Sequence, residues 1–271
     1  MNGTSVFQAI IWDYYQANGR HDLPWRQAGP SAVLDSYHIV VSEMMLQQTQ
    51  VSRVIPKYLE FLELFPTVQA LSSAELSSVL RAWSGLGYNR RAKFLWQAAG
   101  EVVGHHDGTF PSTERELVAL PGIGKNTAGA VLAYAYNQPA VYVETNIRTV
   151  FLHHFFDGQN AVSDAAILSK VAETLDLDTP REWYWALMDY GSYLKKSEAT
   201  STARSASYVR QSTFQGSRRQ IRGQVIRHLT LVGTASYGAL LLAINNDRLG
   251  SVLADLVAEG MIHKSDDVYR L

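Results

Sequence analysis

Two glutamates are the residues whose type and setting could carry acid and charge chemistry. Glu43 lies in the segment HIVVSEMMLQQTQV, and at helical spacing its neighbours are Ile39, Val40 and Leu46. A helix would place this carboxyl group on an apolar face, where burial raises a carboxyl pKa because it disfavours the charged form. An acid that keeps its proton near neutral pH can act as a general acid. The alternative is a structural glutamate that forms an ion pair at the edge of the core.

The second carboxyl group, Glu144, stands at the expected start of a helix. It follows the apolar run VYV and precedes TNIRTVFLHHF, which has helical periodicity. The helix macrodipole and the free N–H groups favour an ionised carboxylate there, so we expect Glu144 to be charged. Two carboxyl groups whose pKa values are pushed apart are typical of an acid paired with an anion that stabilises positive charge. The alternative for Glu144 alone is a capping role.

A glycine hairpin, LPGIGKNTAGA at residues 120–130, could bind an anion. It is not a nucleotide-binding loop, because Ala119 stands where that loop needs glycine, nor a dinucleotide fingerprint, because Thr127 replaces its third glycine. What remains is a tight turn between two helices, in which Gly122 and Gly124 can take the positive φ that a sharp reversal needs. Free N–H groups at the start of the second helix favour a phosphate. An ordinary helix–helix turn is the alternative.

The elements that must position these residues are helical as far as Lys196. Apolar residues recur at helical spacing, and no strand alternation is convincing. The predicted helices span residues 5–17, 37–48, 50–63, 74–82, 89–104, 113–120, 125–136, 145–156, 163–175 and 181–195. Residues 197–217, rich in Ser, Thr, Ala and Gln, predict a linker or surface loop. Residues 218–271 predict three helices and a hairpin that turns at residues 265–267, which is typical of a winged-helix module.

Positive charge gathers where this module begins. Between residues 199 and 246 the chain has six arginines and no Asp or Glu. We expect Arg218, Arg219 and Arg222 to contact phosphates without reading sequence. The third helix of the module, residues 245–260, carries three acidic side chains against one arginine and is expected to pack rather than enter a groove. The alternative is a solvated appendage that never touches nucleic acid.

Composition excludes several kinds of site. The 271 residues are 46% hydrophobic, with a net charge of −1, and include no cysteine. Disulfides, thiolate zinc sites, cysteine-bound iron–sulfur clusters and cysteine nucleophiles are therefore excluded. The N-terminal segment TSVFQAIIWDYYQ indicates an amphipathic helix rather than a signal peptide, and no apolar run reaches membrane-spanning length. We expect a monomeric cytoplasmic protein that does not bind membranes.

Five motifs together resemble one family. They are LPWR (23–26), SEMMLQQTQV (42–51), GLGYNRRA (85–92), LPGIGKNTAG (120–129) and ETNIRTV (144–150). Their order over residues 5–195 is similar to that of the helix-hairpin-helix DNA glycosylases, and among these to the MutY-like adenine glycosylases of A/G mismatches. The resemblance implies a mainly α, two-lobed fold. One lobe would comprise residues 1–28 and 138–196, the other residues 29–137 with the hairpin, followed by the linker and the winged-helix-like module.

The resemblance also implies a role for each matching residue. Glu43 would protonate N7 of the departing purine, and Glu144 with its neighbour Asn146 would stabilise the cationic sugar. The residues expected to contact DNA are Gln47, Gln48 and Tyr88, of which the last two would wedge into the base stack, and the hairpin residues Gly122, Gly124 and Lys125. The base pocket is expected to include Arg26, Asn126 and Trp185.

Several residues depart from the family pattern. Glu144 stands where an Asp is usual, and Trp185 where the family often has a polar residue that reads the base. Asn126 replaces the lysine of the bifunctional lyase branch, and Lys125 is no substitute, because one residue along a helix rotates a side chain by about 100°. The four cysteines of the iron–sulfur cluster and the domain that recognises oxidised guanine are both missing.

The sequence therefore predicts a monofunctional DNA glycosylase without a cofactor. Its partner would be double-stranded DNA with a mismatched or damaged base, and its substrate adenine opposite guanine or oxidised guanine. Two alternatives stay open. One is another base in the same chemistry, such as thymine or uracil opposite guanine, or hypoxanthine. The other is a catalytically silent protein that binds lesions, although a pure binder gains nothing from a buried carboxyl group.

Overall fold

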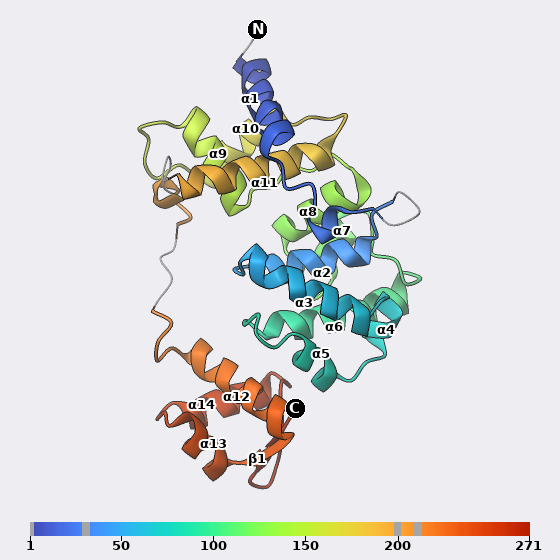
Figure 1. The fold of residues 1–271 in the computed structure, drawn as a ribbon, viewed down its shortest axis with the longest axis vertical. Helices are drawn as coiled ribbons and strands as arrows, with labels where there is room; N and C mark the ends of the chain where they lie inside the picture. The colour runs from blue at the N-terminus through green and yellow to red at the C-terminus, as the bar shows by residue number, and fades with distance from the viewer. Residues whose placement is uncertain (1–2, 29–32, 198–201, 209–212) are drawn as a thin grey trace. The chain divides into compact units, whose positions relative to one another are not determined.

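The computed structural model describes residues 3–28, 33–197, 202–208 and 213–271, and its regular structure is mainly helical (Figure 1). Residues up to Lys196 form helices α1 (Gly3–Asn18), α2 (Ser36–Leu46), α3 (Val51–Leu64), α4 (Val68–Ser72), α5 (Leu76–Ala82), α6 (Arg90–His105), α7 (Glu114–Ala119), α8 (Lys125–Tyr136), α9 (Thr145–Phe155), α10 (Asp164–Thr174) and α11 (Pro180–Lys196). The ten predicted helices are present. Two short elements were not predicted, namely α4 and the 3₁₀ helix Pro24–Arg26. Within the described residues no helix is long and apolar enough to cross a membrane.

Contacts divide the chain into two units. The first comprises the described residues of 1–43 and 110–210, and the second those of 44–109 and 211–271. This division differs from the expected lobes, because the hairpin between α7 and α8 falls in the first unit. The C-terminal module falls in the second unit, where α12 (Arg218–Val232) packs against α5.

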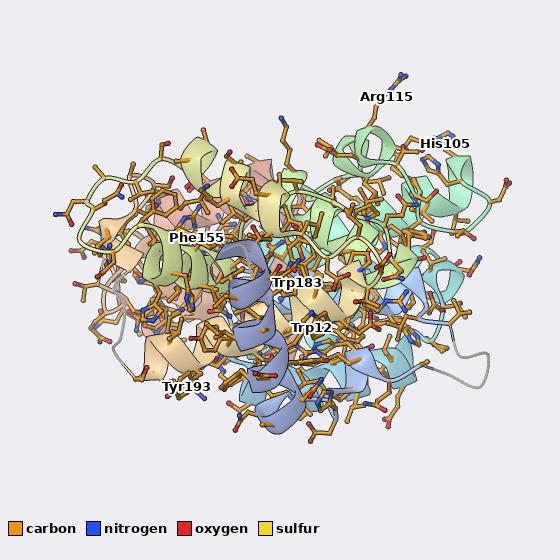
Figure 2. All side chains as sticks on the ribbon, turned by 90° about the horizontal axis from the view of Figure 1, so that it is seen from above. Trp12, His105, Arg115, Phe155, Trp183 and Tyr193 are labelled. Atoms are coloured by element: carbon orange, nitrogen blue, oxygen red, sulfur yellow. The ribbon has the colours of Figure 1, made fainter. Side chains whose placement is uncertain are left out.

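The first unit is built around α11. This helix packs against α1, α8 and α9, and it buries Trp183 and Tyr184 completely. Aromatic rings fill the space between these helices. The rings of Trp12 on α1 and Trp183 are 5.6 Å apart, and Figure 2 shows the two side chains close together beside α1.

A short segment beyond α11 is fastened to the first unit. The 3₁₀ helix Thr202–Arg204 contacts α9, and Ser205 forms a β-bridge with Val162. The Arg204 guanidinium donates to the carbonyl oxygens of Phe156, where α9 ends, and of Gln159, the latter at 2.9 Å. Residues 202–208 are therefore docked rather than a free linker, whereas the rest of the expected linker lies partly outside the described residues.

The C-terminal module has the predicted winged-helix-like arrangement. It contains α12, α13 (Tyr237–Ile244) and α14 (Leu249–Ala258) with the strands β1 (Thr234–Ser236), β2 (His263–Ser265) and β3 (Val268–Arg270). The strands form an antiparallel sheet in the order β1-β3-β2, with Arg270 opposite both Thr234 and His263. The hairpin turns between Ser265 and Val268, as expected, and β1 is an addition that the sequence analysis missed.

Candidate active site

Glu43 and Glu144 lie in the same unit and interact electrostatically. Glu43 is in the last turns of α2, and Glu144 immediately precedes α9. Both side chains are partly buried, and the charge of Glu144 acts on Glu43 strongly enough to raise its pKa. The structure therefore brings together the two carboxyl groups that lie 101 positions apart in the sequence (144 minus 43).

Burial raises the pKa of both carboxyl groups. The pKa of Glu43 lies well above its usual value, mainly because burial penalises the charged form and also because Glu144 is near. Burial raises the pKa of Glu144 to about 7. The expectation that the helix N-terminus would keep Glu144 fully ionised is therefore wrong, and its side chain makes no capping hydrogen bond. The negative charge of Glu144 adds to the effect of burial on Glu43 and favours the protonated form of Glu43.

Arg26 supplies positive charge to this site. Its guanidinium lowers the pKa of Glu43 and so opposes part of the effect of burial. The side chain of Arg26 is 4% exposed and forms a two-bond ion pair with Asp189, at 2.8 and 3.0 Å. Asp189 is itself buried and also binds Arg20. Asp189 was not predicted as a site residue, although it is an acid among the aromatic residues of α11.

Trp185 lies in a stack of flat groups. Its ring is 6.0 Å from that of Tyr134 on α8 and nearly parallel to it, while the Arg26 guanidinium lies 5.2 Å from the Trp185 ring. Tyr134 and Glu43 also interact electrostatically. Two of the expected pocket residues, Arg26 and Trp185, are thus placed together near the acid.

The backbone leading to Glu144 is held against α8. Asn126 donates from its side-chain amide to the carbonyl oxygen of Val143, at 2.9 Å. Tyr142 packs on Gly129, where an added Cβ would lie 2.7 Å from the tyrosine ring. The expected pocket residue Asn126 therefore contacts the segment that carries Glu144.

Asn146 is fixed by the neighbouring helix. A Cβ added at Gly191 on α11 would lie 2.2 Å from the carbonyl oxygen of Asn146, so only glycine fits at this crossing. The backbones of α9 and α11 meet here without intervening side chains. Asn146 lies in the first turn of α9, two residues beyond Glu144.

The hairpin has one left-handed glycine rather than two. Gly122 has a φ of 77°, as predicted, but Gly124 has a φ of −89° and serves as the N-cap of α8. Gly124 does not use the positive φ open to a glycine, because an extended N-cap, which any residue can adopt, is enough to start the helix. Lys125 and Asn126 follow it in the first turn and are exposed.

The two expected wedge residues share an uncommon backbone conformation. Gln48 has a φ of 55° and Tyr88 a φ of 48°, in the left-handed region that favours glycine. α2 ends at Leu46, two residues earlier than predicted, because this conformation cannot continue a right-handed helix. Gln47 and Gln48 thus lie in the turn that follows α2, and Tyr88 is exposed.

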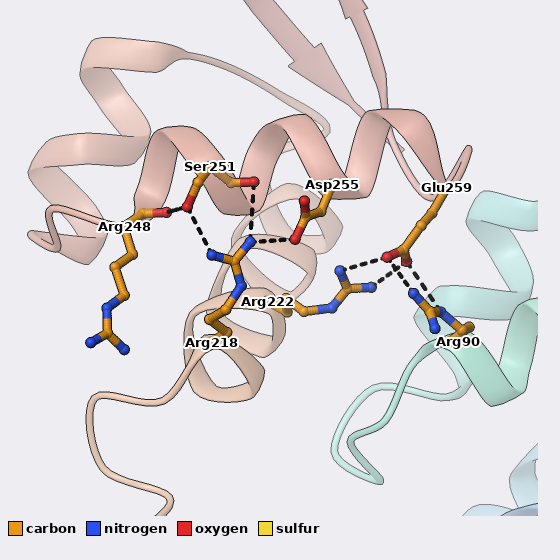
Figure 3. Close-up of polar contacts among 7 residues, drawn as sticks. All are labelled: Arg90, Arg218, Arg222, Arg248, Ser251, Asp255 and Glu259. Atoms are coloured by element: carbon orange, nitrogen blue, oxygen red, sulfur yellow. Dashed lines mark hydrogen bonds and ion pairs between the residues drawn. The ribbon is translucent and has the colours of Figure 1, made fainter.

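The three expected DNA-binding arginines of α12 have internal partners, and Figure 3 shows those of Arg218 and Arg222. Arg218 pairs with Asp255, and Arg222 pairs with Glu259 at 2.5 Å. Glu259 also accepts from Arg90 on α6, so it joins the module to the rest of the second unit. Arg219 donates to the Tyr88 hydroxyl at 3.2 Å, and its guanidinium lies 5.5 Å from the Phe214 ring. The sequence analysis had not paired these arginines with the acids of α14.

The helical fold, the hairpin and the paired carboxyl groups define a class of DNA repair protein. Residues 41–173 match the model of the HhH-GPD superfamily of base excision DNA repair proteins. The chain is 33% identical to the adenine DNA glycosylase of Mycolicibacterium smegmatis, over 97% of this chain and 94% of that protein. The chain therefore belongs to the adenine DNA glycosylases of the HhH-GPD superfamily.

Other relatives are longer or more distant. The chain is 36% identical to the adenine DNA glycosylase of Buchnera aphidicola subsp. Baizongia pistaciae, over 70% of this chain but only 53% of that protein. Among solved structures, a thermostable thymine-DNA glycosylase shares the fold with a TM-score of 0.62 at 24% identity, covering 70% of this chain and 86% of its own. A covalent endonuclease III–DNA intermediate has a TM-score of 0.56 at 14% identity, covering 74% and 90%.

Proposed function

We propose that this protein releases adenine from DNA by hydrolysing its N-glycosidic bond, acting on adenine opposite guanine or oxidised guanine. The observation that carries the proposal is the Glu43–Glu144 pair, in which burial raises the pKa of both carboxyl groups and the charge of Glu144 raises that of Glu43 further. The similarity to the adenine DNA glycosylase of Mycolicibacterium smegmatis extends over nearly the full length of both chains, which supports adenine as the base.

The two carboxyl groups divide the reaction between them. Glu43 donates its proton to a ring nitrogen of the adenine, which makes the base a better leaving group. The bond from the sugar to the base then breaks, and the electron pair leaves with the base. Ionised Glu144 stabilises the cationic sugar, helped by the polar side chain of Asn146, until water adds at the vacated carbon and passes a proton to the Glu43 carboxylate, which restores the acid. The pKa of about 7 leaves a large fraction of Glu144 ionised at neutral pH.

Base excision requires that the nucleotide leave the helix. We propose that Gln48 and Tyr88 enter the base stack while the target base is extruded. The hairpin residues Gly122 and Gly124 present N–H groups of α8 to a phosphate, and the exposed Lys125 adds positive charge. Gln47 lies beside Gln48 in the same turn and would contact the strand there.

We propose hydrolysis without strand cleavage. A lyase needs an amine nucleophile that forms a Schiff base, and the position that bears it in the lyase branch is Asn126, whose amide is engaged with Val143. Strand breaks should therefore require added alkali, and borohydride should trap no protein–DNA adduct.

One observation favours a different base as the second candidate. Trp185 is buried, with Tyr134 stacked on its ring and the Arg26 guanidinium 5.2 Å from it, and it stands where a polar reader is common in the family. A buried apolar ring does not supply the polar contacts by which a site selects one base over another. Thymine or uracil opposite guanine, or hypoxanthine, would then be released by the same acid.

A substrate panel tests the proposal. Duplexes with adenine opposite guanine, oxidised guanine, cytosine and thymine would be compared with thymine, uracil and hypoxanthine opposite guanine, each with and without alkali and with borohydride. Release of adenine opposite guanine or oxidised guanine, revealed only by alkali, is the expected result. Preference for another base would support the second candidate, and binding without release of any base would indicate a lesion-binding protein.

A further inference from the structure

Arg91 on α6 is a buried cation that donates hydrogen bonds to neutral oxygens. Only 8% of the residue is exposed. Its Nη1 donates to the carbonyl oxygens of Met44 at 2.5 Å and Met45 at 3.0 Å. Its Nη2 donates to the carbonyl oxygen of Gly87 at 3.0 Å and to Oγ1 of Thr49 at 3.2 Å. Burial lowers the pKa of Arg91 to about 10, so the side chain stays charged at neutral pH.

These four oxygens belong to two separate segments, namely the end of α2 with the turn that follows it, and the turn that precedes α6. Met44 and Met45 lie in the last turn of α2, where carbonyl groups lack helical partners and attract a cation. Thr49 directly follows Gln48, and Gly87 directly precedes Tyr88. A single nitrogen, Nη2, thus joins the residue after one wedge to the residue before the other.

The backbone of both wedges needs such support. Gln48 and Tyr88 each hold a left-handed φ that costs free energy for a residue with a Cβ. Such conformations persist only where the surroundings over-determine them. The guanidinium of Arg91 lies 5.6 Å from the Tyr88 ring and 5.4 Å from the Trp83 ring, so it also restrains the Tyr88 side chain through a cation–π contact.

We propose that Arg91 is a positioning residue that holds the two wedge loops as one piece, so that Gln48 and Tyr88 enter the base stack together. The inference rests on the proposed function, in which these two side chains enter DNA. Arg91 itself touches neither the base nor the sugar. A lysine could not replace it, because one ammonium lacks the planar fork that reaches both loops at once.

The test compares Arg91→Lys with wild type on a duplex that carries fluorescent 2-aminopurine next to the target adenine. Stopped-flow fluorescence reports unstacking, and single-turnover alkali assays report base release. We expect Arg91→Lys to lose most of the fluorescence rise and to slow release by about tenfold to a hundredfold, since misplacement of about 1 Å can have such effects. Its Kd for undamaged duplex should change by less than about threefold, because the phosphate contacts lie elsewhere. Arg81→Lys is the matched control, since Arg81 is exposed on α5 in the same unit.

A second variant keeps the test decisive if Arg91→Lys fails to fold. Thr49→Val is nearly isosteric and removes the Oγ1 atom that accepts from Arg91 and donates to the Gln47 carbonyl oxygen at 3.3 Å. Thr49→Ser, which keeps the hydroxyl group, is its control. A reduced fluorescence rise with an unchanged melting temperature would support the inference. If wild type releases adenine and a folded Arg91→Lys protein unstacks the duplex normally, the inference about Arg91 is overturned. If Arg91→Lys does not fold, normal unstacking by Thr49→Val overturns it. A wild type that neither unstacks nor releases the base would overturn the proposed function and the inference with it.

Discussion

Asn126 holds the residue next to Glu144 in place. Its Nδ2 atom lies 2.9 Å from the carbonyl oxygen of Val143, which links the first turn of α8 to the backbone that carries the anionic carboxyl group. The side chain at this position therefore serves geometry, whereas a lysine here would serve as a nucleophile.

Asn126→Ala should lower the rate of base release by about tenfold to a hundredfold while leaving the fold intact. The lost hydrogen bond lies at an exposed position and should change the free energy of unfolding by only about 1 kcal/mol, but freeing Val143 lets Glu144 drift from the sugar. Single-turnover release and thermal melting would be measured together. Gln138→Ala, at a polar residue just beyond the C-terminal end of α8, serves as a control that should retain normal release.

Glu43→Gln should abolish base release. An amide cannot donate the proton that the leaving base needs, and general acid catalysis typically contributes ~10²–10⁴-fold. DNA binding should stay within a few-fold of wild type, because the carboxyl group is not a phosphate contact. The measurement is single-turnover release beside a binding titration, and unchanged turnover would mean that another residue is the acid.

The rate of base release should depend on pH as a bell-shaped curve. Release should rise as Glu144 ionises, around its pKa of about 7, and fall at higher pH as Glu43 loses its proton. In Glu144→Gln the alkaline limb should move to lower pH, because the negative charge that raises the pKa of Glu43 is gone. Single-turnover rates from about pH 5 to about pH 9 would measure both limbs. A flat profile would contradict the assignment.

Glu144→Gln should also make the folded protein more stable. The pKa of Glu144 rises from 4.5 to about 7 on folding, so its stabilising contribution is present below about pH 4.5 and is lost as pH rises towards 7. Glu144→Gln should therefore gain stability relative to wild type across that window, by on the order of 2–3 kcal/mol. Melting curves of wild type and Glu144→Gln at about pH 4.5 and about pH 7 measure this difference.

Arg204→Ala should lower the melting temperature, whereas a chelator should not. The substitution removes the bonds that fasten residues 202–208 to the end of α9, each contributing about 1 kcal/mol, and each lost kcal/mol lowers the melting temperature by roughly 2–4 °C. Arg115→Ala is the control, since Arg115 is exposed and points away from the ribbon in Figure 2. A chelator-sensitive melt would point to a metal that the cysteine-free sequence does not predict.

Arg219→Ala should reduce the salt dependence of DNA binding, and Arg218→Ala or Arg222→Ala should do so less. Arg219 donates to the Tyr88 hydroxyl, at the place where this wedge residue would meet the DNA backbone. Its loss should therefore reduce the slope of log K against log salt concentration by up to about 0.9. The other two arginines already pair with Asp255 and Glu259, and their loss should instead destabilise the module. Arg227→Ala, exposed on the same helix, is the control. An equal slope for all four variants and wild type would mean that the module does not touch DNA.

The sequence predicted the helices and the burial of Glu43 because both depend on local patterns. The apolar neighbours of Glu43 predict its burial, and the apolar periodicity of α11 predicts a buried helix. The pKa of Glu144 could not be predicted in the same way, since it depends on how much protein surrounds a residue at a helix start, which spacing does not reveal.

Long-range partners were also beyond the sequence. Asp189 binds Arg26 across 163 positions and Arg222 binds Glu259 across 37, and nothing local marks either pair. The role of Arg91 was hidden for the same reason, although GLGYNRRA was noticed as a motif. A single acid on the buried face of an aromatic helix, as at Asp189, is the one signal that could have been found.

The contact between Gly191 and Asn146 has a consequence for how this protein can vary. Most helix spacings follow the size of the side chains between them, so they shift whenever the core is repacked. Here main chain rests directly on main chain, and the separation of α9 from α11 at this point does not depend on which side chains fill the surrounding interior. The aromatic core of the first unit can therefore accept substitutions while the start of α9 keeps its distance from α11.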